Sequence, residues 1–490
     1  MRRRAQSAER KAHSAQRKYQ RAALRQAQDG QAAGSSQRAA GDNPMYSAHD
    51  DIIRPAFSTV EKRLRFDDRL DRQLRIQGWD QAALDGAKIG VVGDDDLLAS
   101  LYIVSASALG INNISAVAPV LDETLIETAK RVNPRLNLMF TEGFYTHPVM
   151  DDVFNNCSLI VDLSHYGLAN KLLLEKGYRE NVPIVRGFCY EKDGQQGFKV
   201  FAYRKGREWQ ELEHIVSPNN LPDGHFDDGV LDIIVSGIVL EETKSLLMSQ
   251  KMSKSIISYE RSKLGEVEKD QRILVTGSGA LGVFVGLGLA YAGFLDGTFL
   301  DPDVAETTNL NRQVLFYDAV GESKAETLAR RLSRFFSINA KAQIGYFKRD
   351  TDISSYTVVF DCVDNFETRI VISEKCEEQQ KIMISGGTNV DAGQALFYNP
   401  AVNGRTPAEL LGLYDIVDKR TIDAPERVRA SCKYRPDPSV IMTNQIIAGF
   451  MVDSYRMILA GQIPQNFFYD STRDGRMETG SMRSRNLNDL

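Results

Sequence analysis

The sequence predicts an α/β protein that contains one structural unit twice. Short apolar strands alternate with helices in both halves, the pattern of parallel sheets covered by helices on both faces. The first strand of each half ends at residue 93 or 277, which are 184 residues apart. A later strand ends at residue 162 or 361, which are 199 residues apart. The first copy therefore lacks about 15 residues between its second strand and this later strand.

The individual elements follow from the length and period of the apolar runs. Strands are expected at residues 88–93, 114–118 and 158–162 and again at 272–277, 297–301 and 357–361. Helices are expected at residues 97–110, 231–250, 281–293 and 440–459. A linker near residues 253–269, a strand pair within 386–397 and a hairpin at 466–482 complete the order.

Length and composition divide the chain further. A chain of 490 residues is too long for one ordinary core. Residues 1–50 are basic and poor in large apolar side chains, so we expect a disordered tail, with an arm for an anionic partner or a translation start at Met45 as alternatives. The two units are expected at residues 51–252 and 253–482, the second with a crossover loop at about 402–439, followed by a tail at 483–490.

Charge and cysteine usage exclude several function classes. A formal net charge of −5 gives no support for bulk nucleic-acid binding. The five cysteines include no Cys-x-x-Cys pair, so no zinc is expected, and a reducing, cytoplasmic compartment fits them. Residues 1–40 are too polar for a signal peptide. The apolar run Gly279–Leu295 is expected to be a buried helix, so no membrane partner is expected.

A glycine loop in the second half predicts a nucleotide site. Gly277, Gly279 and Gly282 follow a strand and open a helix, where glycine lets backbone N–H groups approach phosphates. Asp301 ends the next strand and can accept hydrogen bonds from a ribose, or it is simply a solvated strand-end carboxylate. Alone, this motif is most typical of a dinucleotide site in a Rossmann-like fold.

Three further motifs make the pattern more specific. They are Asn-Leu-Asn-Arg-Gln at 309–313, Gly-Glu-Ser-Lys-Ala at 321–325 and Asp-Cys-Val-Asp-Asn-Phe-Glu-Thr-Arg at 361–369. With the glycine loop and Asp301-Pro-Asp303, this second half resembles the ThiF/MoeB/ubiquitin-activating enzyme superfamily. The resemblance implies two tandem ThiF-type adenylation folds, packed as a pseudo-dimer, that use ATP and Mg²⁺.

The resemblance also implies roles for individual residues. Arg312 and Lys324 would hold the triphosphate and stabilise charge as pyrophosphate leaves. Asp364 would hold Mg²⁺ at the carboxyl end of a strand, with Asn365 beside it at the nucleotide. Asn309 and Gln313 would contact nucleotide or phosphate, or serve as turn-capping amides. Arg369 is expected to have either a site role or a role in a helix salt bridge.

The first half resembles the same family but has a damaged nucleotide site. Residues 70–78 match the segment that opens activating-enzyme domains, whereas the glycine loop reads Gly93-Asp-Asp-Asp96, and three acids repel a triphosphate. His165 stands where Asp364 stands in the second half, and the missing residues would carry the Arg312 to Lys324 segment. We expect this half to be inactive and to supply Arg72 to the other site, with a surface ion pair as the alternative for Arg72.

Cys432 is the candidate nucleophile. It precedes the expected helix at 440–459, where activating enzymes carry their thioester-forming cysteine, and nearby Arg429, Lys433 and Arg435 favour a thiolate. The alternatives are an inert loop cysteine or the relic of a lost metal site. Cys376, inside a polar helix, is a poorer candidate.

Together these features predict an activating enzyme for a ubiquitin-like protein. The enzyme would adenylate the C-terminal glycine carboxylate, form a thioester on Cys432 and pass the protein to a conjugating enzyme. One alternative is a sulfur-carrier or small-molecule adenylyltransferase without a thioester. Others are an NAD-dependent Rossmann oxidoreductase, which the Arg312 to Lys324 segment argues against, and a non-catalytic scaffold.

Overall fold

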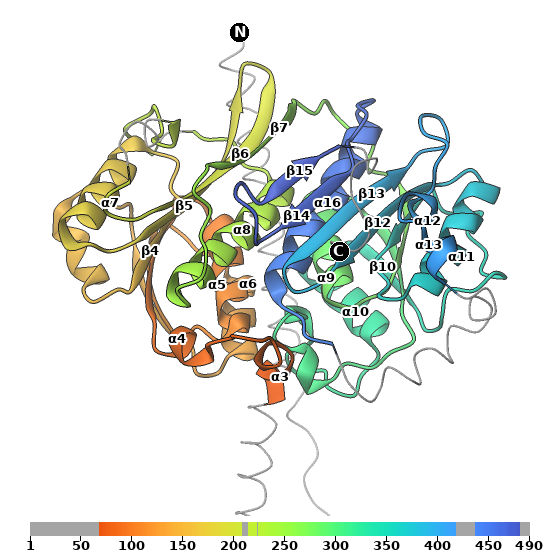
Figure 1. The fold of residues 1–490 in the computed structure, drawn as a ribbon, viewed down its shortest axis with the longest axis horizontal. Coiled ribbons are helices and arrows are strands. Elements are labelled where there is room, and N and C mark those ends of the chain that lie inside the picture. The colour runs from red at the N-terminus through yellow and green to blue at the C-terminus, as the bar shows by residue number, and fades with distance from the viewer. Residues whose placement is uncertain (1–67, 208–213, 223, 418–436, 481–490) are drawn as a thin grey trace, which may run out of the picture.

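The computed structural model describes residues 68–480 apart from 208–213, 223 and 418–436. These residues form two mixed sheets with their own helices, lying side by side in one molecule (Figure 1). In each sheet the first five strands in the sheet order are parallel to one another. Each strand after these is antiparallel to the strand before it in the order. The predicted α/β class is therefore confirmed. The expected tails at 1–50 and 483–490 lie outside the described residues.

The first sheet has seven strands in the order β3-β2-β1-β4-β5-β6-β7. Its strands are β1 Lys88–Val92, β2 Asn113–Ala118, β3 Asn137–Glu142, β4 Leu159–Asp162, β5 Ile184–Lys192, β6 Gln195–Tyr203 and β7 Ile257–Ser262. Its helices are α3 Asp71–Leu74, α4 Gln81–Asp85, α5 Leu98–Leu109, α6 Glu123–Val132, α7 Gly167–Glu180 and α8 Gly229–Leu247, with 3₁₀ turns η1 Asp68–Leu70 and η2 Pro148–Phe154.

The second sheet has eight strands in the order β10-β9-β8-β11-β12-β13-β14-β15. They are β8 Arg272–Thr276, β9 Asp296–Leu300, β10 Asn339–Gln343, β11 Val358–Asp361, β12 Ile382–Thr388, β13 Ala392–Tyr398, β14 Phe467–Asp470 and β15 Met477–Thr479. Its helices are α9 Ala280–Tyr291, α10 Lys324–Phe336, α11 Phe366–Glu378, α12 Pro407–Leu410, α13 Leu413–Ile416 and α16 Ile441–Leu459, with 3₁₀ turns η4 Thr307–Asn309 and η5 Val314–Phe316.

The two sheets repeat one topology. The seven strands of the first sheet and the first seven of the second follow the same order in space. The first half is shorter than the second in the segment after its second strand, which is within the region where the sequence predicts missing residues. Residues 119–122 join β2 to α6, whereas residues 301–323, with η4 and η5, join β9 to α10.

The first sheet continues past the boundary expected at residue 252. Strand β7, in the expected linker, pairs antiparallel with β6, so the first sheet extends to Ser262. The strand is hard to find in the sequence because Ile257 and Tyr259 are its only large apolar residues. A further inward-facing position is taken by Arg261, which is buried and paired with Asp453. An ion pair thus replaces the apolar signal that predicts a strand.

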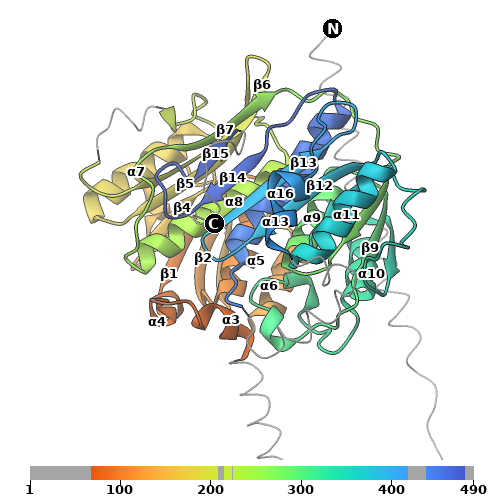
Figure 2. The ribbon, with the colours of Figure 1, turned by 45° about the vertical axis from the view of Figure 1, so that its right-hand side comes forward.

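Helices α8 and α16 join the halves. They pack against each other between the two sheets, with α5 and α9 beside them (Figures 1 and 2). Two glycines allow the close approach: a Cβ on Gly237 would lie 2.8 Å from Ile446 Cγ1, and one on Gly449 would lie 2.3 Å from Ile234 Cγ1. The apolar run expected to be a buried helix is indeed buried here, as α9. In the part of the chain that is described, no helix has the length and apolarity needed to cross a membrane.

Buried ion pairs add to this interface. Arg456 on α16 pairs with Asp228, the N-cap of α8, at 2.9 Å. Arg261 on β7 contacts both Asp228 at 3.2 Å and Asp453 of α16 at 3.0 Å. Because removing one partner from such a pair leaves a buried charge uncompensated, these pairs make the packing of the two halves specific and costly to disturb.

We predict that Gly449→Ala destabilises the protein. Alanine in a helix is favoured over glycine by about 1 kcal/mol, but overpacking against Ile234 costs about 1–3 kcal/mol. The urea midpoint, followed by circular dichroism, should therefore fall. Gly404→Ala is the control, because a Cβ there meets no atom within 4 Å. Equal midpoints for the two variants would contradict this account of the interface.

Candidate nucleotide site

The glycine loop after β8 has the geometry of a phosphate cradle. Gly277 has a φ of 92°, and a Cβ there would lie 2.7 Å from the carbonyl oxygen of Cys362. A Cβ on Gly282 would lie 2.0 Å from the carbonyl oxygen of Gly277. Gly279 caps α9 without a side-chain hydrogen bond, so the first-turn N–H groups are not used by a capping side chain. Such N–H groups and the helix dipole favour a bound anion.

Asp301 lies beside this loop at the end of β9. Its Oδ2 accepts a hydrogen bond from Ser278 N at 2.6 Å, and its Oδ1 accepts one from Asp303 N at 2.8 Å. Burial raises the pKa of Asp301, whereas the Lys324 cation lowers it. The carboxylate therefore braces the loop, and each oxygen keeps a second lone pair for a ligand hydroxyl.

The segment between β9 and α10 returns Lys324 to the same place. An isolated bridge between Val304 and Ser323 closes the segment, and Lys324 N donates to the Asp303 carbonyl at 3.0 Å. Lys324 Nζ lies 3.3 Å from Asp303 Oδ2. The structure thus brings Asp301, Asp303 and Lys324 together at the carboxyl end of β9.

Arg312 is a buried cation that forms no ion pair with any described residue. Its side chain donates to the carbonyl oxygen of Thr308 at 2.9 Å and to Asn311 Oδ1 at 2.8 Å. Burial, and secondarily the Arg72 cation, lower the pKa of Arg312 to about 9, although Glu306 and Asp364 oppose this shift. A buried guanidinium held by neutral oxygens is suited to receive an anionic ligand.

Arg72 reaches this site from the first half. Its Nη1 donates to the carbonyl oxygen of Asp437 at 3.0 Å, and η1 and α3 contact η4 of the second half. Burial lowers the pKa of Arg72, and Glu306 acts in the opposite direction. Arg72 forms no ion pair with a described residue, so the surface ion pair considered as its alternative role is absent from the described structure.

A polar relay that the sequence did not reveal joins Arg312 to the first half. Gln73 donates to the carbonyl of Leu109 in the first half at 2.8 Å, and its Oε1 accepts from Asn311 Nδ2 at 3.2 Å. Asn311 Nδ2 also donates to the carbonyl oxygen of Ser439 at 3.1 Å, while its Oδ1 accepts from Arg312. Gln73 and Asn311 are fully buried, so this chain of hydrogen bonds fixes Arg312 relative to the first half.

The amide side chains have mixed roles. Asn309 Oδ1 accepts from Glu306 N at 3.0 Å and so has the turn-capping role. Asn365 Oδ1 accepts from Thr368 N at 2.8 Å and caps α11. Gln313 is buried, its Oε1 has no hydrogen-bond partner among the described residues, and its Nε2 faces Gly279. Of the three amides, Gln313 is therefore the one whose oxygen is left for a ligand.

Asp364 lies at the carboxyl end of β11 on the same edge of the sheet. It is exposed, and its charge influences Arg312. Arg369 supports this loop: it pairs with Asp361 at 2.8 Å and donates to the carbonyl of Val363 at 2.9 Å. Arg369 thus has the salt-bridge role, and Asp364 is an exposed carboxylate at the edge of the sheet where open α/β sheets bind ligands.

Cys432 lies outside the described residues. The other cysteines, Cys157, Cys189, Cys362 and Cys376, are all buried. Burial raises the pKa of each of these thiols, so the thiolate form is disfavoured at every one.

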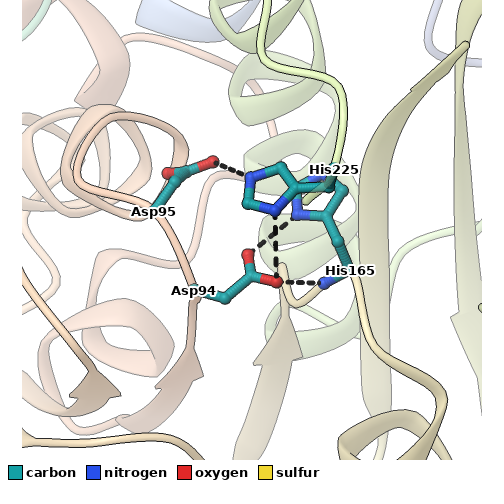
Figure 3. A group of neighbouring side chains, drawn as sticks. All are labelled: Asp94, Asp95, His165 and His225. Carbon is teal, nitrogen blue, oxygen red and sulfur yellow. Dashed lines mark hydrogen bonds and ion pairs between the residues drawn. The ribbon is translucent and has the colours of Figure 1, made fainter. Parts of the chain in front are cut away.

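In the first half, an aspartate side chain occupies the corresponding loop. Asp95 Oδ1 accepts from the N–H groups of Leu97 and Leu98 at 3.0 and 2.9 Å, at the start of α5. A phosphate would need the same donors. Asp94 binds His165, whose backbone N and Nδ1 lie 2.7 and 2.8 Å from its carboxylate (Figure 3). Side chains of the chain itself therefore occupy this loop.

Comparisons with known proteins agree with the second-half motifs. Residues 253–487 match the model of the ThiF family. The chain is 32% identical over 155 residues to the adenylyltransferase and sulfurtransferase MOCS3 of Aedes aegypti, covering 30% of this chain and 36% of that protein. It is 33% identical over 134 residues to the molybdopterin-synthase adenylyltransferase of Escherichia coli, covering 26% of this chain and 54% of that enzyme.

The similarity is partial in every case. The chain spans about a third to about half of the length of these two curated relatives. A crystal structure of E. coli MccB with succinimide superimposes with a TM-score of 0.36 at 20% identity, covering 44% of this chain and 64% of that one. Residues 253–487 of this chain are therefore a ThiF family domain, and its sequence relatives are adenylyltransferases of the ThiF/MoeB/ubiquitin-activating superfamily.

Proposed function

We propose that this chain uses ATP to adenylate the C-terminal glycine carboxylate of a small ubiquitin-like protein. The observation that carries the proposal is Arg312, a buried cation that has no ion pair among the described residues and is close enough to Arg72 for the two charges to interact. The next residue, Gln313, faces Gly279 of the glycine loop. Two adjacent guanidinium groups repel each other, and a triphosphate relieves that repulsion. The adenylyltransferase relatives of the second half give independent support.

The described residues fit ATP. The loop from Gly277 to Gly282 leaves backbone N–H groups for phosphate, and Asp301 can accept from the ribose. Gln313 Oε1 is a buried hydrogen-bond acceptor without a donor among the described residues, so it can accept a hydrogen bond from the nucleotide. Asp364 offers the oxygen ligand that Mg²⁺ prefers, and Mg²⁺ would neutralise charge on the phosphate oxygens.

The reaction follows from this placement. A carboxylate oxygen of the small protein attacks the α-phosphorus, the bond from that phosphorus to the β-phosphate oxygen breaks, and pyrophosphate leaves. Negative charge grows on the leaving oxygens in the transition state. Arg312, Arg72 and Lys324 are fixed cations that stabilise this charge without reorganising, because their positions are already set by the protein.

Both halves are needed in this proposal, in which the chain is a tandem pseudo-dimer of ThiF-type folds. The first half at about 51–262 is the inactive partner, and its contribution is Arg72. The second half supplies the remaining groups. Three observations support this division: the shared strand order, the occupied Asp94–Asp95 loop, and the contact of η1 with η4.

We further propose that Cys432 takes the acyl group as a thioester and that a conjugating enzyme then receives it. The sulfur would attack the acyl carbon and AMP would leave. Support comes from the burial of the four other cysteines. The order of the chain adds to it: Cys432 is five positions before Asp437, whose carbonyl oxygen accepts a hydrogen bond from Arg72.

Activation of a sulfur carrier without a thioester is a second candidate. The names of the relatives favour it, since one is an adenylyltransferase and sulfurtransferase and the other serves molybdopterin synthase. Both candidates share the adenylation step and differ only in the fate of the adenylate.

Arg72→Ala is expected to lower ATP–pyrophosphate exchange by about 100-fold or more, because it removes a fixed cation from the transition state. Exchange is measured with small ubiquitin-fold proteins that end in glycine. Arg75→Ala is the matched control, since Arg75 pairs with Asp71 on the surface and should leave the rate unchanged. Equal exchange rates for the two variants would show that Arg72 does not take part in adenylation.

Cys432→Ala is expected to keep ATP–pyrophosphate exchange and to lose any reductant-sensitive conjugate on a non-reducing gel. Cys157→Ala, which changes a buried thiol of the first half, should retain both. If the wild type catalyses exchange but forms no such conjugate, the result favours an adenylyltransferase without a thioester over the Cys432 proposal. If Cys432→Ala still forms the conjugate, the nucleophile is another residue.

A further inference from the structure

A cluster of two aspartates and two histidines occupies the ligand-binding edge of the first sheet. Asp94 and Asp95 follow β1, His165 follows β4, and His225 precedes α8 (Figure 3). Strands β1 and β4 are neighbours, and the carboxyl ends of adjacent parallel strands are where open α/β sheets bind ligands. The cluster therefore stands where the second half has its nucleotide site.

The donor atoms of the cluster are close enough for one ion. One ligand atom from each of the four side chains can be chosen so that all lie within 4.8 Å of one another. His165 Nδ1 lies 2.8 Å from Asp94 Oδ1, and His225 Nδ1 lies 3.9 Å from Asp94 Oδ2. The other ring nitrogen of His225, Nε2, lies 3.6 Å from Asp95 Oδ2. Tetrahedral ligands bonded at about 2.0–2.2 Å have mutual separations of about 3.3–3.6 Å, which these distances bracket.

The chemistry of the donors selects the class of ion. Two imidazoles and two carboxylates suit zinc and similar divalent transition metals, whereas Mg²⁺ and Ca²⁺ take oxygen ligands. The two carboxylates balance the charge of a divalent ion. Asp227 Oδ1 lies 2.7 Å from His225 Nε2, so it can orient that ring while Nδ1 binds the ion.

One ring nitrogen of His165 lacks a hydrogen-bond partner within the cluster. Its side chain is only 6% exposed, and its Nε2 has no hydrogen-bond partner among the described residues. A buried polar atom without a partner costs about 1–3 kcal/mol. An ion bound at Nε2 would satisfy this atom, whereas an ion bound at Nδ1 would replace the hydrogen bond to Asp94.

The rings of His165 and His225 define the movement that binding requires. They are stacked 4.0 Å apart at an angle of 5°. An imidazole binds a metal in its ring plane, so one ion cannot lie in both planes while the rings stay parallel. His225 is the ring that turns, because it lies on the irregular segment before α8 and is the more exposed of the two.

We propose that Asp94, Asp95, His165 and His225 bind one divalent transition metal ion of the zinc type, closed by rotation of His225. The ion would link the loops after β1 and β4 to the segment before α8. Because all four positions would be filled by protein, this is a structural site rather than a catalytic one. It would give the first half a bound cation where the second half binds ATP.

The test is zinc binding by the full chain. The protein is stripped with chelator and dialysed, titrated with ZnCl₂ by calorimetry, and examined with Co²⁺ for the visible absorption of a tetrahedral site. Wild type should bind one ion in the cluster, and His225→Gln should lose it. His214→Gln, which changes an exposed histidine outside the cluster, should retain it. Asp227→Asn should weaken binding by about 10- to 100-fold.

Two results would overturn the proposal. One is a wild-type protein that binds no stoichiometric zinc. The other is equal zinc binding by wild type and His225→Gln, which would place the ion elsewhere in the chain. Circular dichroism of His225→Gln without metal checks that the variant is folded, and Asp95→Asn provides a second ligand variant if it is not.

Discussion

The packing of α8 against α16 is the constraint on which the rest of the structure depends. Gly237 and Gly449 let the two helices approach so closely that a methyl group fits at neither position. Around this contact, Asp228, Asp453 and two arginines pair away from water. Apolar packing favours the association, and the buried ion pairs select one register, because a shifted arrangement leaves charges unpaired. This register brings Arg72 of one half to Arg312 of the other.

The two halves contribute different charged groups to the proposed nucleotide site. The first half has only residues 119–122 where the second half carries the Asn309 to Lys324 motifs, and Asp95 occupies its helix N-terminus. The second half has the glycine loop, Arg312 and Lys324, whereas Arg72 and Gln73 come from the first half. Neither half alone holds the complete set of charges. The proposed function thus rests on an interface as much as on a motif.

Much of the fold could be predicted from the sequence, because the central strands and α9 are continuous apolar runs. The edge strands β3 and β10 are hard to predict because Asn137–Glu142 and Asn339–Gln343 lie at sheet edges, are largely exposed and show no alternation of apolar and polar residues. Strand β7 was missed because the buried Arg261 replaces an apolar residue. In each case tertiary contacts, which single-residue patterns do not contain, decide the structure.

The site was predictable where a local motif dictates backbone geometry, as at Gly277 and Gly282. It was not predictable where a role depends on distant partners. Asn309 and Asn365 cap turns, whereas Asn311 joins Gln73 to Arg312 across 238 residues of sequence. The Asp94 to His225 cluster has no recognisable ligand spacing because three separate loops supply it. Cys432 remains a prediction.

The most direct test of the account is a double-mutant cycle on ATP binding. ATP with Mg²⁺ is titrated by calorimetry into wild type, Arg72→Ala, Arg312→Ala and the double variant. If the two halves build one site, the wild type binds one ATP per chain and the two losses are non-additive by at least about 0.5 kcal/mol. Two ATP molecules per chain, or strictly additive losses, would contradict the claim that Arg72 and Arg312 act on the same nucleotide.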